Sequence, residues 1–335
     1  MTTHRIGFWL GILALILLGG CEALGGPKTL KLGHGLNVDH PVHQGMVYMA
    51  KRLAEKSDGQ LQMEIYPSSQ LGGERQCLEL LQIGSLAMTK VSASVMENFS
   101  PKVQVVGLPY LFRDREHVYE TLDGPIGEEL LADGERYWLR GLAYFDAGYR
   151  SFYTKERPVR QPADLDGLKI RVQESAVALE LVRQLGAAPT PIAWGELYTA
   201  LQQGVVDGAE NNPPSFYTSR HYEICKYYSL NEHTAVPDIL VIGKVAWQGL
   251  DEREQTWLKE AAYEATLEQR KLWQAAEREA LEAVQAAGVE IIRPEKAPFE
   301  QKTRDMLESY RDRPELYDLI QRIQAVGKGG RGEGE

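Results

Sequence analysis

Two stretches of the chain, LLQIGSLAMTKV at residues 80–91 and ALQQGVVDGAEN at residues 200–211, decide the fold because they align without gaps. Each stretch has the end of a helix, the motif Leu-Gln-x-Gly, and then a short strand. Gly84 matches Gly204 since both positions close a helix, where a left-handed residue is needed. This repeat predicts two similar α/β lobes, each of which presents a loop at the end of a strand to a shared cleft.

The same alignment predicts which side chains face the cleft. Ligands of α/β sheets bind beyond the carboxyl ends of the strands. We therefore expect Lys90 and Val91 to face the cleft from the first lobe, and Glu210 and Asn211 from the second.

Strands alternate with helices on both sides of the repeat, so the fold class is α/β. The segment 251–288 contains no proline and no glycine before Gly288, and its pattern predicts one long helix. A helix of this length would span roughly 55 Å, more than one small lobe. Its apolar positions do not hold a clean heptad, so we expect a helix that spans both lobes rather than a coiled coil.

The N-terminus has the pattern of an export signal. An apolar run from Ile6 to Leu18 is followed by Leu-Gly-Gly-Cys, which resembles a bacterial lipobox. We expect residues 1–20 to be a lipoprotein signal peptide and Cys21 to carry lipid, which would leave the mature protein periplasmic and tethered to a membrane. The alternative is a plain signal peptide with a chance cysteine. The polar, glycine-rich residues 326–335 are expected to form a disordered tail.

Composition excludes some partners. The formal net charge of −10 argues against nucleic acid or an anionic membrane surface as the main partner. Two cysteines besides Cys21, Cys77 and Cys225, do not make a disulfide framework. A bridge between them is possible in an exported protein, but two buried thiols are favoured.

Familiar catalytic and cofactor motifs are missing. The sequence contains no Rossmann glycine motif, phosphate-binding loop, H-E-x-x-H, C-x-x-C or G-x-S-x-G, and we expect no cofactor. An enzyme that uses Glu74 or a histidine stays an alternative. A zinc site built from His34, His40, His43 and Asp39 is another, although their spacing matches no common zinc signature.

Two arginines are candidates for binding an anion. Arg171 lies in mid-strand in LKIRVQES (168–175), and Arg150 follows the strand AYFDAG. A planar guanidinium pairs with a carboxylate through two hydrogen bonds, so the pair would suit an organic acid. Asn211 could add an amide donor. Flat apolar walls could come from Trp194 and Tyr198.

Several strings together resemble one known family. Three strings are similar to motifs of the solute-binding proteins of tripartite ATP-independent periplasmic (TRAP) transporters and follow one another in the order expected for that family. They are LPYLFRD, LKIRVQES and APTPIAWGELYTALQQGVVDGAEN. The resemblance covers residues 29–325. It implies a two-lobed periplasmic receptor that closes on an organic acid and delivers it to a large and a small membrane subunit.

The resemblance also implies roles for single residues. The arginine after the D-L-x-G-L-K turn, which pairs with the ligand carboxylate in this family, corresponds to Arg171. A second frequent contact corresponds to Arg150, the asparagine of D-G-x-E-N to Asn211, and the aromatic residue of P-T-P-x-x-[FW] to Trp194. Receptors that only sense their ligand would share this pattern.

The expected substrate is a uronate or a related sugar acid, because the run 209–223 looks like that branch of the family. A sugar acid needs partners for its hydroxyl groups. The candidates are Glu74, His34, Lys90, Ser92 and Asp238. C4-dicarboxylates or keto acids are the alternative, and they would require a second cation, for which Lys90 is the candidate. The expected lobes are residues 28–147 with about 237–276, and residues 148–236 with about 277–325.

Overall fold

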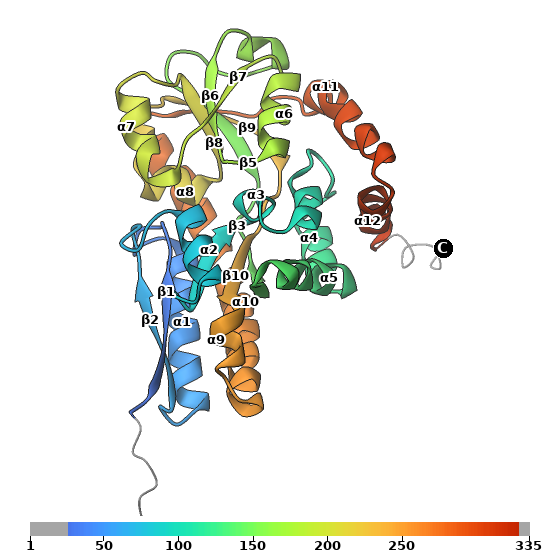
Figure 1. Cartoon of the computed structure of the whole chain (residues 1–335). Coiled ribbons are helices and arrows are strands. Elements are labelled where there is room, and N and C mark those ends of the chain that lie inside the picture. Colours follow the sequence, from blue (N-terminus) through green and yellow to red (C-terminus); the bar gives the residue numbers. More distant parts are fainter. Residues whose placement is uncertain (1–25, 328–335) are drawn as a thin grey trace, which may run out of the picture.

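The computed structural model describes residues 26–327, which form two α/β lobes, drawn one above the other in Figure 1. The predicted signal peptide, the lipid attachment at Cys21 and residues 328–335 of the predicted tail lie outside the described residues. Among the described residues, no helix is both long enough and apolar enough to cross a membrane.

The first lobe is built on a five-stranded sheet with the strand order β2-β1-β3-β10-β4. Its strands are β1 (Lys28–Gly33), β2 (Leu61–Tyr66), β3 (Met88–Ser92), β4 (Leu139–Phe145) and β10 (Asp238–Gly243). β1 pairs in parallel with β2 and β3, whereas β10 runs antiparallel to β3 and β4. The chain thus leaves this sheet after β4 and returns to it through β10.

The second lobe has a six-stranded sheet with the order β11-β9-β5-β8-β6-β7. Its strands are β5 (Arg150–Thr154), β6 (Lys169–Val172), β7 (Ala188–Pro191), β8 (Gly208–Asn211), β9 (Tyr227–Thr234) and β11 (Glu290–Ile292). β6 lies parallel to β7 and β8, while β5 lies antiparallel to β8 and β9.

Helices connect and cover the strands. Those before β5 are α1 (Pro41–Lys56), α2 (Glu74–Gln82), α3 (Ala93–Met96), α4 (Arg115–Leu122) and α5 (Pro125–Asp133), with 3-10 helices η1 (Pro101–Gly107) and η2 (Gly134–Tyr137). Those between β5 and β9 are α6 (Ala176–Gln184), α7 (Leu197–Gln202) and α8 (Pro213–Thr218), with η3 (Pro162–Leu165), η4 (Trp194–Glu196) and η5 (His221–Glu223). Those after β10 are α9 (Lys244–Gln248), α10 (Glu252–Ala286), α11 (Ala297–Glu308), η6 (Ser309–Asp312) and α12 (Pro314–Ala325).

The repeated motif takes the same conformation in both lobes. α2 ends just before Gly84 and α7 just before Gly204, and these glycines have φ angles of +75° and +74°. A left-handed residue at this place turns the chain from the helix into the next strand, β3 or β8. The prediction that the two stretches are structurally equivalent is therefore confirmed.

The long helix α10 runs from Glu252 to Ala286, within two residues of the predicted ends. It begins with a capping box, because the Asp251 carboxylate accepts from the Glu254 N–H and the Glu254 carboxylate accepts from the Asp251 N–H, both at 2.8 Å. Along its length α10 packs against α1 and β4 of the first lobe and α8 of the second. The predicted α/β fold with a helix spanning both lobes is confirmed.

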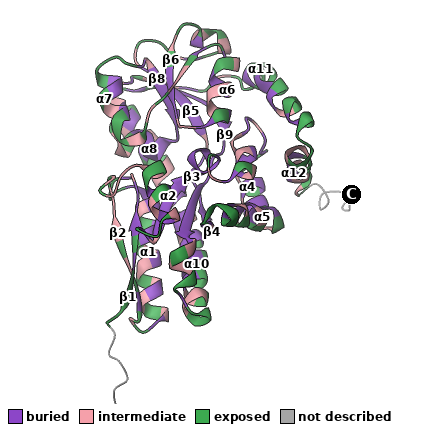
Figure 2. Ribbon diagram, in the orientation of Figure 1, coloured by how far each residue is buried: buried purple, intermediate pink, exposed green. Residues whose placement is uncertain are grey.

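The hydrophobic core follows the two sheets, whose strands are mostly buried in Figure 2. One cluster lies between β1, α1 and α10, a second lies within the second lobe, and a third extends across both lobes. Cys77 belongs to the third cluster and Cys225 to the second, and both are buried free thiols. The favoured interpretation of two buried thiols is confirmed.

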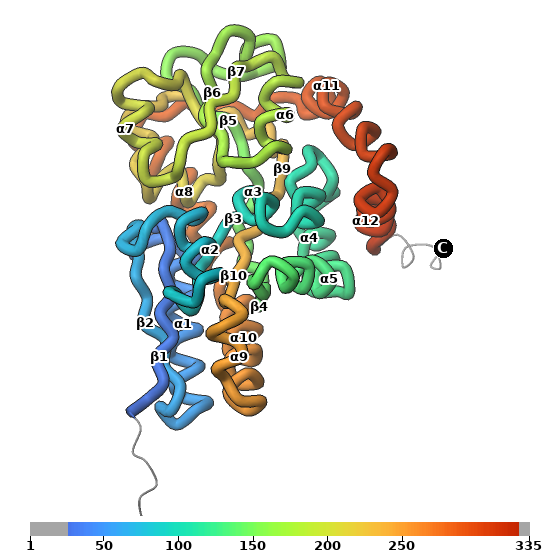
Figure 3. Tube along the Cα trace, viewed as in Figure 1, coloured from blue at the N-terminus to red at the C-terminus, as the bar shows by residue number. Residues whose placement is uncertain are grey.

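The C-terminal helices connect the lobes on one side (Figure 3). α11 packs against α6 and β9 of the second lobe, while α12 packs against α5 and η1, which precede β4. The residues expected to form the end of the second lobe therefore contact both parts of the molecule. The exact boundaries of the lobes stay a prediction.

Side chains also meet across the cleft, so the two lobes are closed on each other. His40 Nε2 and Ser215 Oγ are 3.1 Å apart, and Ser92 Oγ donates to Gln173 Oε1 at 3.2 Å. The carboxylate of Glu97, beside α3, accepts from Ser175 Oγ at 2.9 Å at the start of α6. These contacts enclose a space between the two sheets.

Candidate functional site

A cavity of about 540 Å³ lies between the lobes. This size is within the usual range for small-molecule sites. Eight of the nine predicted binding residues line it, namely Arg171, Arg150, Asn211, Trp194, Glu74, Lys90, Ser92 and Asp238. The ninth, His34, does not. The predicted site residues are therefore largely brought together, although they come from stretches up to 164 residues apart (Asp238 minus Glu74).

Arg171 reaches the cavity because it alternates with buried neighbours on β6. Ile170 and Val172 point into the core, so the side chain between them points toward the cleft. Arg171 is nevertheless only 2% exposed, and its guanidinium carbon lies 5.9 Å from the centre of the Trp194 ring. An aromatic face at this distance attracts a cation.

The guanidinium of Arg171 is buried without an acid. Its one hydrogen bond within residues 26–327 runs from Nε to the carbonyl oxygen of Ile192 at 2.8 Å, and its buried Nη1 has no partner. Burial lowers the pKa of this guanidinium, because desolvation disfavours its charge. An unpaired buried cation is costly, so this geometry calls for an anion from outside the chain.

Arg150 has a different environment from the one the sequence suggests. Its Nη2 donates to Glu210 Oε1 at 2.8 Å and to the Glu210 carbonyl at 2.7 Å, its Nη1 donates to Asn211 Oδ1 at 2.9 Å, and its Nε pairs with Glu210 Oε2. Four of the five N–H groups that an arginine carries are therefore occupied. Arg150 keeps one N–H on Nη1 for a ligand.

Glu210 is the partner that the sequence analysis misplaced. It was expected to face the cleft together with Asn211, but neighbouring strand residues point to opposite faces. Only Asn211 lines the cavity, and in the first lobe Lys90 lines it while Val91 does not. Burial favours the neutral form of Glu210, yet the attraction of Arg150 outweighs it and lowers the pKa of Glu210 to about 2.

The first lobe contributes a cluster of one base and two acids. Lys90 Nζ lies 2.6 Å from Glu74 Oε1 and 3.2 Å from Asp238 Oδ1. The cluster forms because β10 pairs with β3 so that Asp238 lies opposite Ser92, two residues along from Lys90. Burial opposes the charge of Lys90, but Asp238 and Glu74 together raise its pKa. The charge of Lys90 is thus neutralised within the chain, while two of its three N–H groups have an acid partner.

His34 lies outside the cavity lining because both of its ring nitrogens are used nearby. Nδ1 accepts from the Leu36 N–H at 3.1 Å, and Nε2 lies 3.0 Å from His43 Nδ1. Burial and the nearby Lys90 lower the pKa of His34 to about 3. His40 caps α1 through the Val42 N–H at 3.2 Å. Residues 26–327 contain no group of three His, Cys, Asp or Glu side chains that could hold a metal ion.

Other lining residues were missed. Gln173, two residues beyond Arg171, lines the cavity and contacts Ser92, as the alternation along the strand would have indicated. Asn212 and Ser215 line it at the start of α8. Tyr198, expected as a wall, does not line the cavity, and its hydroxyl donates to Glu223 at 2.8 Å.

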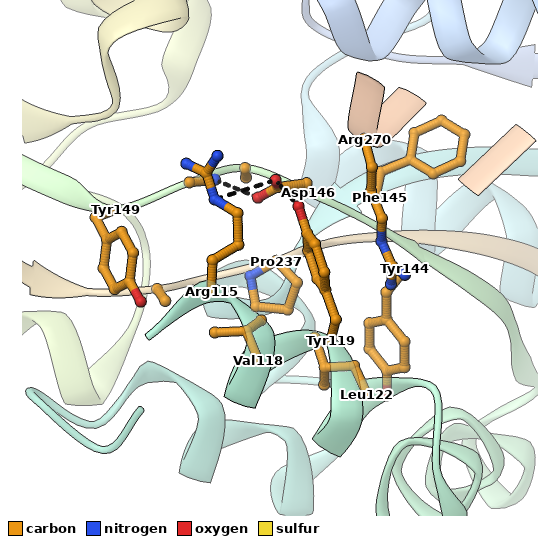
Figure 4. Close-up of a pocket in the computed structure, with 13 residues that line it drawn as sticks. Arg115, Val118, Tyr119, Leu122, Tyr144, Phe145, Asp146, Tyr149, Pro237 and Arg270 are labelled. Atoms are coloured by element: carbon orange, nitrogen blue, oxygen red, sulfur yellow. Dashed lines mark hydrogen bonds and ion pairs between the residues drawn. The ribbon is translucent and has the colours of Figure 1, made fainter. Parts of the chain in front are cut away.

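Two further cavities do not fit an organic acid as well. One, shown in Figure 4, lies beside Asp146, directly after β4, and its volume of about 20 Å³ suits a single water. The other, of about 660 Å³, is a groove lined by Tyr110, Arg113 and Lys296. Lys296 is paired with Glu232, and Arg113 donates to the Gln324 and Val326 carbonyls; both side chains are exposed, so neither is a buried cation without an acid like Arg171.

The histidines make the stability of the protein depend on pH. Each histidine of the described chain has a lowered pKa, and burial is the largest cause; these are His34, His40, His43, His117, His221 and His233. A histidine kept neutral in the folded state favours folding above its unfolded pKa of about 6.5, and this contribution is lost as the pH falls below that value. We expect the free energy of unfolding to fall steeply from pH 6.5 toward pH 4.

Denaturant titrations at several pH values test this expectation. Glu97, Asp238 and Glu277 work in the opposite direction, since burial raises their pKa values, that of Glu97 to about 7, but they are three groups against six. His221→Asn should reduce the fall in the free energy of unfolding between pH 6.5 and pH 4, because burial and Arg171 lower the pKa of His221 to about 3. His43→Asn, at a less buried position, should change this pH dependence less. A free energy of unfolding that stays constant from pH 7 to pH 4 would contradict the account.

Comparison with known proteins agrees with this geometry. Residues 32–313 match the family described as bacterial extracellular solute-binding protein, family 7, or DctP. A TRAP periplasmic solute-binding protein from a Bradyrhizobium species, solved in complex with α/β-D-galacturonate, is 40% identical, with 89% of this chain and 100% of that chain covered and a TM-score of 0.87.

Two more relatives show the breadth of the family. A TRAP periplasmic solute-binding protein from Pseudomonas putida F1 with bound D-glucuronate is 36% identical, covers 89% of this chain and 97% of its own, and has a TM-score of 0.86. The C4-dicarboxylate-binding periplasmic protein of Rhodobacter capsulatus is 33% identical over 311 residues, 90% of this chain and 92% of its own.

These relatives are extracytoplasmic solute-binding proteins rather than enzymes, so the enzyme alternative is not supported. The resemblance inferred from the sequence motifs is confirmed over almost the same residues. The chain belongs to the DctP family of bacterial extracellular solute-binding proteins.

Proposed function

We propose that this protein is the receptor for a sugar acid, most specifically a uronate, whose carboxylate pairs with Arg171. The observation that carries the proposal is the buried guanidinium of Arg171, which has no acid partner within residues 26–327. A ligand carboxylate would accept two parallel hydrogen bonds from its Nη1 and Nη2. The remaining N–H of Arg150 and the Asn211 amide would complete this end of the site.

The rest of the cavity suits a polyhydroxylated body. Trp194 supplies a flat apolar wall beside Arg171, and sugar rings have C–H faces that pack on such walls. Glu74, Asp238 and Ser92 offer acceptors for hydroxyl groups. The galacturonate and glucuronate bound by the solved relatives support this class of ligand.

The structure also suggests how neutral sugars would be rejected. Closure of the lobes removes water from Arg171, which strengthens its pairing with a carboxylate. A neutral sugar would leave the cation buried without a counter-charge, and such a loss of one partner is strongly unfavourable.

A C4-dicarboxylate is the second candidate, because the Rhodobacter capsulatus relative is named for that ligand. A second carboxylate would need a second free cation. Lys90 was the candidate for this role, but it is already paired with Glu74 and Asp238. The geometry therefore favours the sugar acid.

Delivery and tethering belong to the same proposal. The bound form would hand its ligand to the large and small membrane subunits of a TRAP transporter, and lipid on Cys21, exposed after cleavage of residues 1–20, would hold the receptor at a membrane. Mass spectrometry of the protein extracted from membranes tests the tether: a lipid-modified N-terminal Cys21 is expected, and an unmodified N-terminus would exclude it.

A thermal-shift panel tests the ligand class. The purified protein is unfolded and refolded to remove any carried ligand, and then melted with uronates, aldonates, C4-dicarboxylates, keto acids and neutral sugars. A ligand that binds only the folded state at 100 times its Kd stabilises it by about 2.7 kcal/mol. We expect a raised Tm with uronates or aldonates and none with neutral sugars. A shift with dicarboxylates alone would overturn the ligand class, and no shift with any acid would overturn the proposal.

A further inference from the structure

We propose that Glu74, Lys90 and Asp238 act as a charge filter, so that the receptor accepts a sugar acid with one carboxylate and excludes the corresponding acid with two. This inference rests on the proposed function and adds to it the number of charges that the ligand carries. It assigns to these three residues a role in specificity rather than in affinity for the carboxylate.

The argument begins with the pairing of the buried charges. Three Lys or Arg residues are buried in the described chain: Lys90, Arg150 and Arg171. Arg150 is matched by Glu210, Lys90 is matched by two acids, and Arg171 is matched by none. The cavity therefore has one end with a cation in excess and one cluster with an acid in excess.

The two acids are fixed in place by the fold. Lys90 is 3% exposed and lies on β3, Asp238 lies on the adjacent strand β10, and Glu74 is the first residue of α2. The Ser92 N–H also donates to Glu74 Oε2 at 3.3 Å. Both carboxylates thus have partners on rigid elements and are held toward the same ammonium group.

A ligand carboxylate at this cluster would be a third acid for one base. Burying like charges side by side is unfavourable, and Arg171 already takes the one carboxylate that the site can neutralise. A ligand hydroxyl carries no charge and so avoids this repulsion. It can donate a hydrogen bond to Glu74 or Asp238 and accept one from the third N–H of Lys90. The cluster therefore fits the hydroxyl end of a monocarboxylic sugar acid.

Calorimetric titration with matched acids tests the filter. The probes are D-galacturonate, D-galactonate and galactarate, of which the last two are open-chain acids that differ only in whether the sixth carbon is a hydroxymethyl group or a carboxylate. We expect the wild type to bind galactarate at least about 100-fold more weakly than the better of the two monocarboxylates. Glu74→Gln keeps the shape of the side chain but removes one negative charge, so this ratio should shrink by about tenfold or more.

The matched control is Glu79→Gln, on the exposed side of the same helix and paired with Arg75. It should leave the ratio unchanged. If Glu74→Gln does not fold, Asp238→Asn removes the other excess charge and carries the same test. A wild type that binds galactarate within tenfold of the better monocarboxylate, or a folded Glu74→Gln variant with the wild-type ratio, would overturn the filter. Tight binding of both classes overturns only this inference, whereas binding of no acid overturns the proposed function as well.

Discussion

Replacing Arg171 with alanine is expected to weaken binding of the sugar acid by about 2–5 kcal/mol, roughly 30- to 4000-fold. The change removes a pair of charge-assisted hydrogen bonds and leaves the buried ligand carboxylate with only the remaining N–H of Arg150 and the Asn211 amide. Calorimetric titration of the purified variant measures the loss. Arg171→Lys should also bind more weakly, because an ammonium group lacks the planar geometry that matches a carboxylate.

Arg171→Ala should lower the affinity for the ligand without lowering the stability of the fold. In the ligand-free protein Arg171 is a buried charge without an acid, so its removal should leave the Tm unchanged or raise it, although the affinity falls. Arg183→Ala, an exposed arginine on α6 that does not line the cavity, is the matched control and should leave the affinity unchanged. Wild-type affinity in Arg171→Ala would remove Arg171 from the site.

Replacing Glu210 with glutamine is expected to destabilise the protein by about 3–5 kcal/mol, because it leaves Arg150 as a second buried cation without an acid. The free energy of unfolding in denaturant measures this loss. Glu308→Gln breaks an exposed pair with Arg311 and is the matched control, for which at most about 1 kcal/mol is expected.

A double variant tests whether Glu210→Gln destabilises the protein because Arg150 loses its acid or because the new side chain at position 210 packs less well. Arg150→Met combined with Glu210→Gln removes the orphaned cation, so it should recover part of the stability that Glu210→Gln loses. If Glu210→Gln were as stable as the wild type, Arg150 would not depend on Glu210, and Arg150 would be free to serve as a second carboxylate partner.

Much of the fold could be predicted because its signals are local. The Leu-Gln-x-Gly motif at Gly84 and Gly204 needs a left-handed residue to end a helix, and that requirement does not depend on the rest of the chain. The length of α10 follows from an uninterrupted helical pattern between Asp251 and Gly288. The cavity position of Arg171 follows from strand alternation between two core residues.

The parts that could not be predicted depend on contacts between distant residues. Whether a buried cation is free or paired depends on its neighbours in space, and Lys90 finds Asp238 only through the pairing of β3 with β10. His34 was expected in the site as a hydrogen-bond partner for the hydroxyl groups of a sugar acid. A hydrogen bond to His43, on the first turn of α1, instead holds it outside the cavity lining.

The most direct test of the central claim is a crystal structure of the protein with the sugar acid that gives the largest thermal shift. The account predicts that the two carboxylate oxygens lie about 2.7–2.9 Å from Nη1 and Nη2 of Arg171. The sugar hydroxyls should then face Glu74 and Asp238. A carboxylate bound at Lys90, or Arg171 left without a ligand oxygen, would contradict it.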